Sequence, residues 1–138
     1  LKNGSSKQEF NLVAEGIRKM ALLWQLVKNG TLEKGSVLFW DEPEANINPT
    51  YISVIVEMLL ELQRQGVQIF ISTHDYMIAS YFAVKKREGD SVIFHSLSHE
   101  EGTDSICYDR SEVFDNLKNN AIITAFNGLL NEIYNMGV

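Results

Sequence analysis

Apolar residues follow two kinds of spacing along the chain, and each kind predicts a different element. From Ala14 to Lys28 they recur at steps of three and four, which predicts a helix that ends at Asn29-Gly30. The buried face of this helix is expected to consist of Ile17, Met20, Ala21, Leu23, Trp24 and Val27. The same spacing returns after Pro49 and stops at Gly66, which predicts a second helix.

Two short, mostly apolar runs flank this second helix. The first is "SVLFW" at 36–40 and the second is "VQIFIS" at 67–72. Runs of this kind are typical of strands that are covered on both faces of a parallel sheet. A strand, a helix and a strand at this spacing predict a right-handed crossover, so the predicted fold class is α/β.

The last third of the chain predicts smaller elements. A short helix is expected over "DYMIASYFAV" at 75–84, followed by an antiparallel hairpin with its turn at "HEEGTD". Two further helices are expected at 111–117 and 121–135. The apolar side of the last one consists of Ile122, Ala125, Phe126, Leu129, Leu130 and Ile133.

Composition narrows the class of protein. The 138 residues suit one domain or one lobe of a larger domain, and the net charge of -6 argues against a broad nucleic-acid footprint. No apolar run approaches the roughly 20 residues of a membrane span. The single Cys107 allows no internal disulfide, so we expect a cytoplasmic protein without a membrane partner. The polar opening at 1–11 is expected to be a linker or a cloning remnant on a piece of a longer protein.

Polar chemistry follows both predicted strands at the point where they end. Asp41 and Glu42 come directly after the first strand, and "STHD" at 72–75 ends the second. The carboxyl ends of parallel strands form the ligand-binding edge of an open sheet, and successive strand side chains point to opposite faces. One carboxylate can therefore hold a cation while the other faces a water molecule. Oxygen ligands without a cysteine cluster favour Mg²⁺, and with a histidine nearby they indicate phosphoryl chemistry.

These residues also carry a family resemblance. "VLFWDEPE" resembles the Walker B strand of an ABC-type ATPase, "ANINP" the D-loop that follows it, and "IFISTHD" the switch strand with its histidine. "NLVAEGIRKMALLWQL" is similar to the signature motif and the helix that it caps. "DEPEANINP" resembles the RecF/OLD-like, non-transporter class more than transporter subunits. The resemblance covers 12–75 and implies a partial P-loop NTPase-like domain, so residues 1–138 are expected to be the C-terminal lobe of such an ATPase.

The resemblance assigns roles to individual residues. It implies that Asp41 holds Mg²⁺ through water, that Glu42 is the catalytic base, and that His74 senses the γ-phosphate of ATP. It also places Asn46 and Asn48 in a D-loop at a dimer interface.

The resemblance further implies a nucleotide contact with the partner subunit. Gly16, with Arg18 and Lys19 after it, would present a helix N-terminus to the phosphate of ATP that the partner holds. Ala14 aligns with the usual signature serine and Ile17 with the usual glutamine, which indicates a weakened or remodelled contact.

The phosphate-binding part of such an ATPase has no counterpart here. The pattern G-x-x-x-x-G-K-[ST], the Walker A loop, does not occur in the 138 residues. The resemblance therefore implies a missing Walker A lobe as a partner, and an isolated chain that is inactive.

The expected function is ATP binding and hydrolysis within an ATP-sandwich homodimer. Closure of the dimer would act on a partner such as DNA, a nuclease or a toxin, for example in DNA repair or defence. The alternative is a non-catalytic module that keeps the ATPase fold for dimerisation, a reading that Ala14 favours. A metal-dependent nuclease is a weaker third hypothesis, because no D-x-D pair follows the acidic strand end.

Overall fold

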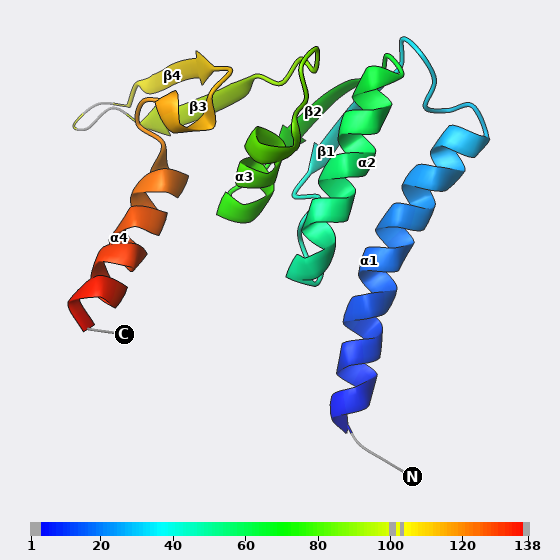
Figure 1. The fold of residues 1–138 in the computed structure, drawn as a ribbon, viewed down its shortest axis with the longest axis horizontal. Helices are drawn as coiled ribbons and strands as arrows, with labels where there is room; N and C mark the ends of the chain where they lie inside the picture. The colour runs from blue at the N-terminus through cyan, green and yellow to red at the C-terminus, as the bar shows by residue number, and fades with distance from the viewer. Residues whose placement is uncertain (1–3, 100–101, 103, 137–138) are drawn as a thin grey trace.

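The computed structural model describes residues 4–99, 102 and 104–136, with side chains described from Glu15 onward. Helices and strands alternate along the first part of the chain, and a hairpin and a helix follow (Figure 1). The elements are α1 (Gly4–Lys28), β1 (Val37–Asp41), η1 (Pro49–Tyr51), α2 (Ile52–Arg64), β2 (Gln68–Ser72), α3 (Tyr76–Lys85), β3 (Phe94–His99), β4 (Ile106–Ser111), η2 (Phe114–Asn116) and α4 (Ala121–Met136).

The strands β1 and β2 form a parallel pair, as the sequence predicts. Val37 pairs with Gln68 at one end and Asp41 with Ser72 at the other. The helix α2 connects the two strands, because a parallel pair cannot be joined by a tight turn. The mixed α/β class and the parallel sheet are therefore confirmed.

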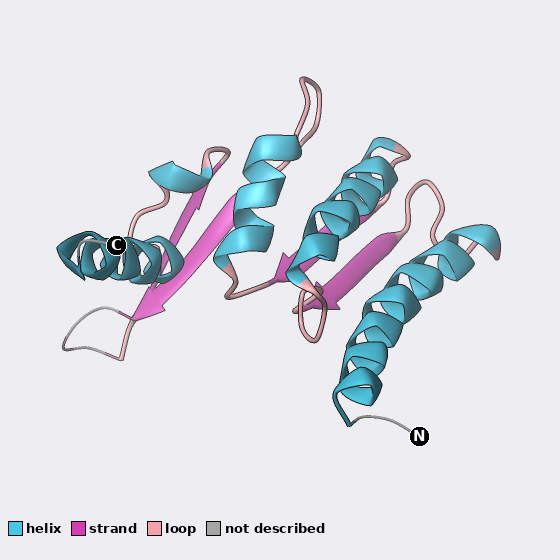
Figure 2. Cartoon of the chain, turned by 60° about the horizontal axis from the view of Figure 1, so that its bottom comes forward, coloured by secondary structure: helices cyan, strands magenta, loops and turns pink. Residues whose placement is uncertain are grey.

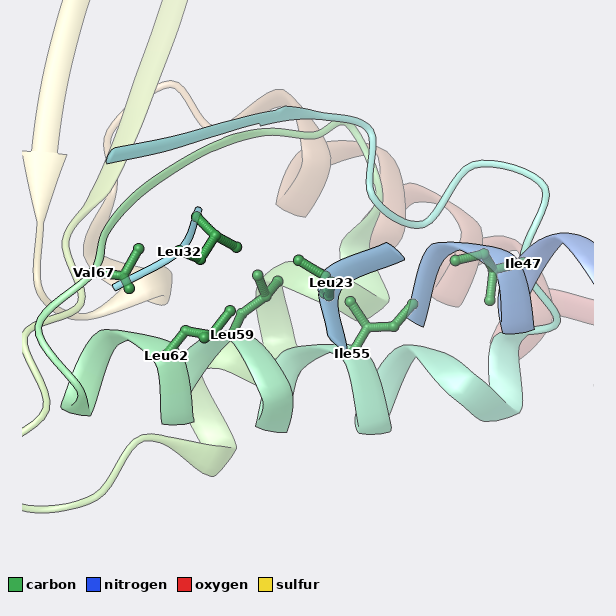
Figure 3. Packing of buried hydrophobic residues seen from close by; sticks show 7 residues of the cluster. All are labelled: Leu23, Leu32, Ile47, Ile55, Leu59, Leu62 and Val67. Atoms are coloured by element: carbon green, nitrogen blue, oxygen red, sulfur yellow. The ribbon is translucent and has the colours of Figure 1, made fainter. Parts of the chain in front are cut away.

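One face of this sheet is packed against α1 and α2 (Figure 2). Leu23 of α1 lies against Ile55 and Leu59 of α2 in the centre of the core (Figure 3). The sheet contributes side chains that alternate along each strand and are partly buried, namely Leu38, Trp40, Ile69 and Ile71. Burial of this apolar surface is the main driving force that holds the two helices on the sheet.

The other face of the sheet is open in the described part of the chain. Val37, Phe39 and Phe70 are 48%, 75% and 46% exposed. The two phenylalanine rings stack with centroids 4.9 Å apart. The sequence predicts strands covered on both faces, and this prediction is wrong for the described residues, because α1 and α2 lie on the same side. We call Val37, Phe39 and Phe70 the open sheet face.

The C-terminal part contains the predicted antiparallel hairpin of β3 and β4. Phe94 pairs with Ser111 at one end, and His99 pairs with Ile106 at the other. The helix expected at 111–117 is reduced to the short η2, because Ser111 belongs to β4. The helix α4 forms as predicted and leads away from the sheets (Figure 1). None of its residues is fully buried, although Phe126 stacks on Tyr76 with ring centroids 3.8 Å apart.

Two expectations about α1 need correction. The helix begins at Gly4 rather than at Ala14, so most of the stretch expected to be a linker is helical. The residues after the two serines, Lys-Gln-Glu, have good helix propensity, and no proline interrupts them. Of the six residues expected on the buried face, only Leu23 is buried and Met20 is partly buried, whereas Ile17, Ala21, Trp24 and Val27 are exposed. Trp24 is 61% exposed, and the Lys28 ammonium lies 4.8 Å from its ring centroid. The buried face is therefore narrower than predicted and is centred on Leu23.

An ion pair ties the end of α2 to the loop after α3. The Arg64 guanidinium donates to both carboxylate oxygens of Asp90, with Nε–Oδ1 at 2.9 Å and Nη2–Oδ2 at 2.6 Å. The backbone N–H of Arg87 donates to the same carboxylate at 2.8 Å. The Arg64 side chain first, and this N–H second, lower the pKa of Asp90 from 3.8 to about 2.

We expect this pair to make stability depend on pH in a defined window. Because the pKa of Asp90 is lower in the folded chain, its contribution is complete above pH 3.8 and is lost as pH falls to about 2. Asp90→Asn should therefore lower the urea midpoint at neutral pH, and the gap to the parent should close across this window. Asp104→Asn, at an exposed position in the hairpin loop, is the matched control and should leave the profile unchanged. A gap that stays constant down to pH 2 would contradict the assignment.

Candidate active site

The ends of β1 and β2 bring the predicted acidic pair beside the polar end of the next strand. Asp41 is the register partner of Ser72, and the Ser72 hydroxyl donates a hydrogen bond to the Asp41 carboxylate. The backbone N–H of Glu42 donates to the Ser72 carbonyl at 2.9 Å, which continues the pairing by one residue. Asp41 and Glu42 therefore lie at the carboxyl end of the strand pair, as the sequence predicts.

Glu42 contacts the predicted histidine of the neighbouring strand. The distance from His74 Nδ1 to Glu42 Oε1 is 2.9 Å. The Glu42 side chain is 44% exposed and that of His74 is 81% exposed, so both face solvent at the sheet edge. Asp41 contacts Ser72 while Glu42 contacts His74, which agrees with side chains that point in different directions.

The backbone of Glu42 has an unusual conformation. Its φ angle is +44°, in the left-handed region that residues with a side chain seldom adopt. Such conformations cost about 1 to 3 kcal/mol and concentrate at functional sites. Here the conformation starts a tight turn in which the N–H of Ala45 donates to the Glu42 carbonyl at 3.0 Å. The turn directs the chain away from the strand and leaves the Glu42 carboxylate at the edge.

Sequence reasoning missed a third carboxylate at this edge, that of Glu44. Glu44 Oε1 accepts a hydrogen bond from the Thr73 hydroxyl, while Glu44 Oε2 is buried and has no hydrogen-bond partner among the described residues. Asp75, the residue after His74, caps α3 by accepting from the N–H of Ile78 at 2.9 Å. An aspartate just before a helix is a recognisable capping signal, but nothing in the sequence distinguishes the surroundings of Glu44 from those of an exposed loop carboxylate.

Gly16 does not lie at a helix N-terminus, so this prediction is wrong. It lies well inside α1, where interior N–H groups are used by the helix itself. The glycine instead permits close packing, since a Cβ atom there would lie 3.4 Å from Cγ2 of Ile47. Ala14, the other signature position, also lies within α1, and its side chain is outside the described set.

The other predicted binding residues, Arg18, Asn46 and Asn48, are exposed at the surface. Arg18 is exposed on α1. Asn46 has a φ angle of +58° and its amide nitrogen is 3.4 Å from Oε1 of Glu15. Asn48 caps η1, because its Oδ1 accepts from the N–H of Thr50 at 3.0 Å. Asn46 and Asn48 thus have local structural contacts as well as exposed surfaces.

The donor set at the edge fits a magnesium ion that is shared with a substrate. Asp41 and Ser72 both offer hard oxygen atoms and both are exposed. Among the described residues, no group of three or more histidine, cysteine, aspartate or glutamate side chains is arranged to hold a metal. Mg²⁺ commonly takes one or two carboxylates and completes its shell with water and phosphate oxygens, so a single carboxylate is sufficient.

The described part of the chain contains no helix with the length and apolar character needed to cross a bilayer.

Two curated relatives of the chain are ATP-binding proteins. The chain is 40% identical over 50 residues to the energy-coupling factor transporter ATP-binding protein EcfA of Methanothermobacter thermautotrophicus, covering 36% of this chain and 16% of that protein. The EcfA protein of Methanococcus maripaludis is 41% identical over 49 residues, with shares of 36% and 18%. The aligned segment thus spans less than a fifth of either relative. No solved structure matches the chain.

A family model gives the broader match. It is described as "AAA domain, putative AbiEii toxin, Type IV TA system" and matches residues 3–80, which include α1, β1, α2, β2 and the Glu42–His74 pair. The EcfA relatives are themselves ATP-binding proteins, and the parallel strand pair fits a P-loop ATPase. Because the family match covers more than half of the chain, the protein belongs to this AAA-domain family.

Proposed function

We propose that this chain is the C-terminal lobe of a dimeric, RecF/OLD-like ATPase and supplies the residues that activate water for ATP hydrolysis. The observation that carries the proposal is the 2.9 Å contact between Glu42 and His74 at the carboxyl ends of two neighbouring parallel strands. A carboxylate beside a histidine at this edge is suited to proton transfer next to a phosphate group.

Glu42 acts as the general base. The contact with His74 uses Oε1, and Oε2 accepts the proton of the attacking water. When His74 donates its Nδ1 proton to Glu42, the contact orients both the imidazole ring and the carboxylate. The ring then reaches the terminal phosphate of ATP with its other nitrogen.

Asp41 and Ser72 form the metal-facing side of the edge. The Ser72 hydroxyl fixes the Asp41 carboxylate, which would hold Mg²⁺ through water. When bound, this ion neutralises charge on the phosphate oxygens of ATP. Asn46 and Asn48 form part of the dimer interface, and the exposed Arg18 faces the nucleotide of the partner subunit. Gly16 is not included among the phosphate-binding groups, because it lies inside α1.

The open sheet face supports the proposal that another lobe completes the domain. Phe39 is 75% exposed and stacks on Phe70, although parallel sheets are normally covered on both faces. His74 is 81% exposed, whereas phosphoryl transfer requires a site from which bulk water is excluded. A Walker A lobe placed over this face and edge would cover both.

Closure of the dimer on ATP would then drive a partner activity. That partner would be DNA, a nuclease or a toxin. The matching family's description refers to a toxin–antitoxin system, which supports a role in defence.

The first test compares this chain with the complete protein. Most triphosphate affinity in P-loop proteins comes from the glycine-rich backbone and its lysine, and the 138 residues contain no such loop. We therefore expect titration calorimetry to show no micromolar binding of MgATP to this chain. The complete protein should bind MgATP and release phosphate. Phosphate release that is absent from the complete protein would refute the ATPase and favour the non-catalytic dimerisation module.

A further inference from the structure

The side chain of Lys19 makes a contact that the ATPase roles above do not use. Its ammonium nitrogen lies 2.7 Å from the carbonyl oxygen of Ala45, 3.2 Å from that of Pro43 and 3.5 Å from that of Glu42. Lys19 belongs to α1, so this contact joins the helix to the turn that follows β1. The sequence suggests a phosphate contact for Lys19, whereas the structure directs it to the backbone of its own chain.

The turn at 42–47, here called the acidic turn, depends on this contact. An ammonium group has three donors, and here three carbonyl oxygens converge on it. Hydrogen bonds from a charged donor are stronger than neutral ones. The contact therefore offsets the cost of the left-handed backbone at Glu42 and Asn46. Without the ammonium, the carbonyl dipoles that point toward one another would repel, and the turn would relax.

Two further contacts show that α1 and the acidic turn are fitted to each other. Ile47, at the end of the turn, is buried against the core, and its Cγ2 would lie 3.4 Å from a Cβ atom at position 16. Glu15 lies one residue earlier in α1 and accepts from the Asn46 amide at 3.4 Å. Glu15, Gly16 and Lys19 thus occupy one side of α1, and all three meet the turn that begins with Glu42.

We propose that Lys19 is a positioning residue that fixes the acidic turn and thereby orients the Glu42 carboxylate for proton transfer. This inference rests on the proposed ATPase function and extends it from the residues at the edge to the helix behind them. A misplacement of about 1 Å in a catalytic group can cost about 10²-fold in rate. Loss of the Lys19 contact should therefore affect turnover more than nucleotide binding.

The activity test uses the complete protein with Lys19→Met, which keeps the length of the side chain and removes the charge and its donors. We expect kcat to fall by about 10- to 100-fold while KM for ATP changes by less than about twofold. Lys19→Arg retains the charge and should recover most of this loss. Lys28→Met makes the same change on the exposed part of α1 and should leave kcat unchanged. In a Glu42→Gln background, Lys19→Met should have no further effect, because the base is already absent.

The second measurement does not depend on activity. It is amide hydrogen exchange in the acidic turn. In Lys19→Met, the N–H groups of Ala45 and Ile47 should exchange about tenfold faster than in the parent chain. Lys28→Met should leave these amides unchanged. If exchange is unaltered, or if the parent is active and Lys19→Met leaves kcat unchanged, the role of Lys19 is refuted while the proposed function stands. A complete protein that releases no phosphate would overturn the proposed function and this inference with it.

Discussion

Glu42→Gln in the complete protein should lower the rate of phosphate release by about 10²- to 10⁴-fold while MgATP binding persists. Glutamine has nearly the same size as glutamate and can still hydrogen-bond the attacking water, but it cannot accept its proton. It can also accept a hydrogen bond from His74 through its carbonyl oxygen, so the geometry of the sheet edge should be preserved. The measurements are phosphate release under saturating ATP and calorimetric affinity for MgATP.

The same variant should also accumulate as an ATP-bound dimer. Closure of the dimer would depend on bound ATP, and reopening would depend on ATP hydrolysis. Slow hydrolysis in the variant would therefore trap the closed state. Mass by light scattering with and without ATP measures this directly. Glu33→Gln, an exposed carboxylate in the loop before β1, is the matched control and should behave as the parent does. A normal rate of phosphate release from Glu42→Gln would exclude Glu42 as the base.

Asp41→Asn should have a different signature, namely a changed dependence on magnesium. Removing a carboxylate that holds a metal through water typically costs about 10- to 100-fold in metal affinity or activity. We therefore expect the Mg²⁺ concentration for half-maximal phosphate release to rise by about this factor. Ser72 can still donate a hydrogen bond to the asparagine oxygen, so the strand end should remain intact.

The control for this variant is Asp115→Asn, an exposed carboxylate in η2, which should leave the magnesium dependence unchanged. A titration with Mg²⁺ at fixed ATP, repeated for the parent and both variants, separates a metal effect from a general loss of activity. If Asp41→Asn lowers the maximal rate without shifting the Mg²⁺ midpoint, Asp41 is not the metal-facing carboxylate.

The sequence was sufficient to predict the parallel strand pair and the residues that follow it. Apolar runs at 36–40 and 67–72 are typical of strands, and each is close to an observed strand. A helix between two strands requires a parallel connection, and parallel strands bring their carboxyl ends to one edge. The meeting of Asp41 with Ser72 and of Glu42 with His74 follows from this connection and from the alternation of side chains along a strand.

The catalytic roles of these residues stay predictions, and so do the dimer and the missing lobe. The family match supports an ATPase domain, whereas a pattern of residue types does not report which proton moves or which ion is held. The magnesium and phosphate-release experiments address those points.

Other features depended on contacts between segments that lie far apart in the sequence. The exposure of Trp24 and of the open sheet face was decided by which side of the sheet α1 and α2 cover. Periodicity shows that a face is apolar, but only packing shows whether another element covers it. The left-handed backbone of Glu42 and the three carbonyl contacts of Lys19 likewise arise where α1 meets the acidic turn. Spacing along the chain therefore determined the elements and the residues at their ends, whereas tertiary packing determined which carbonyls a lysine reaches and which apolar surface stays open.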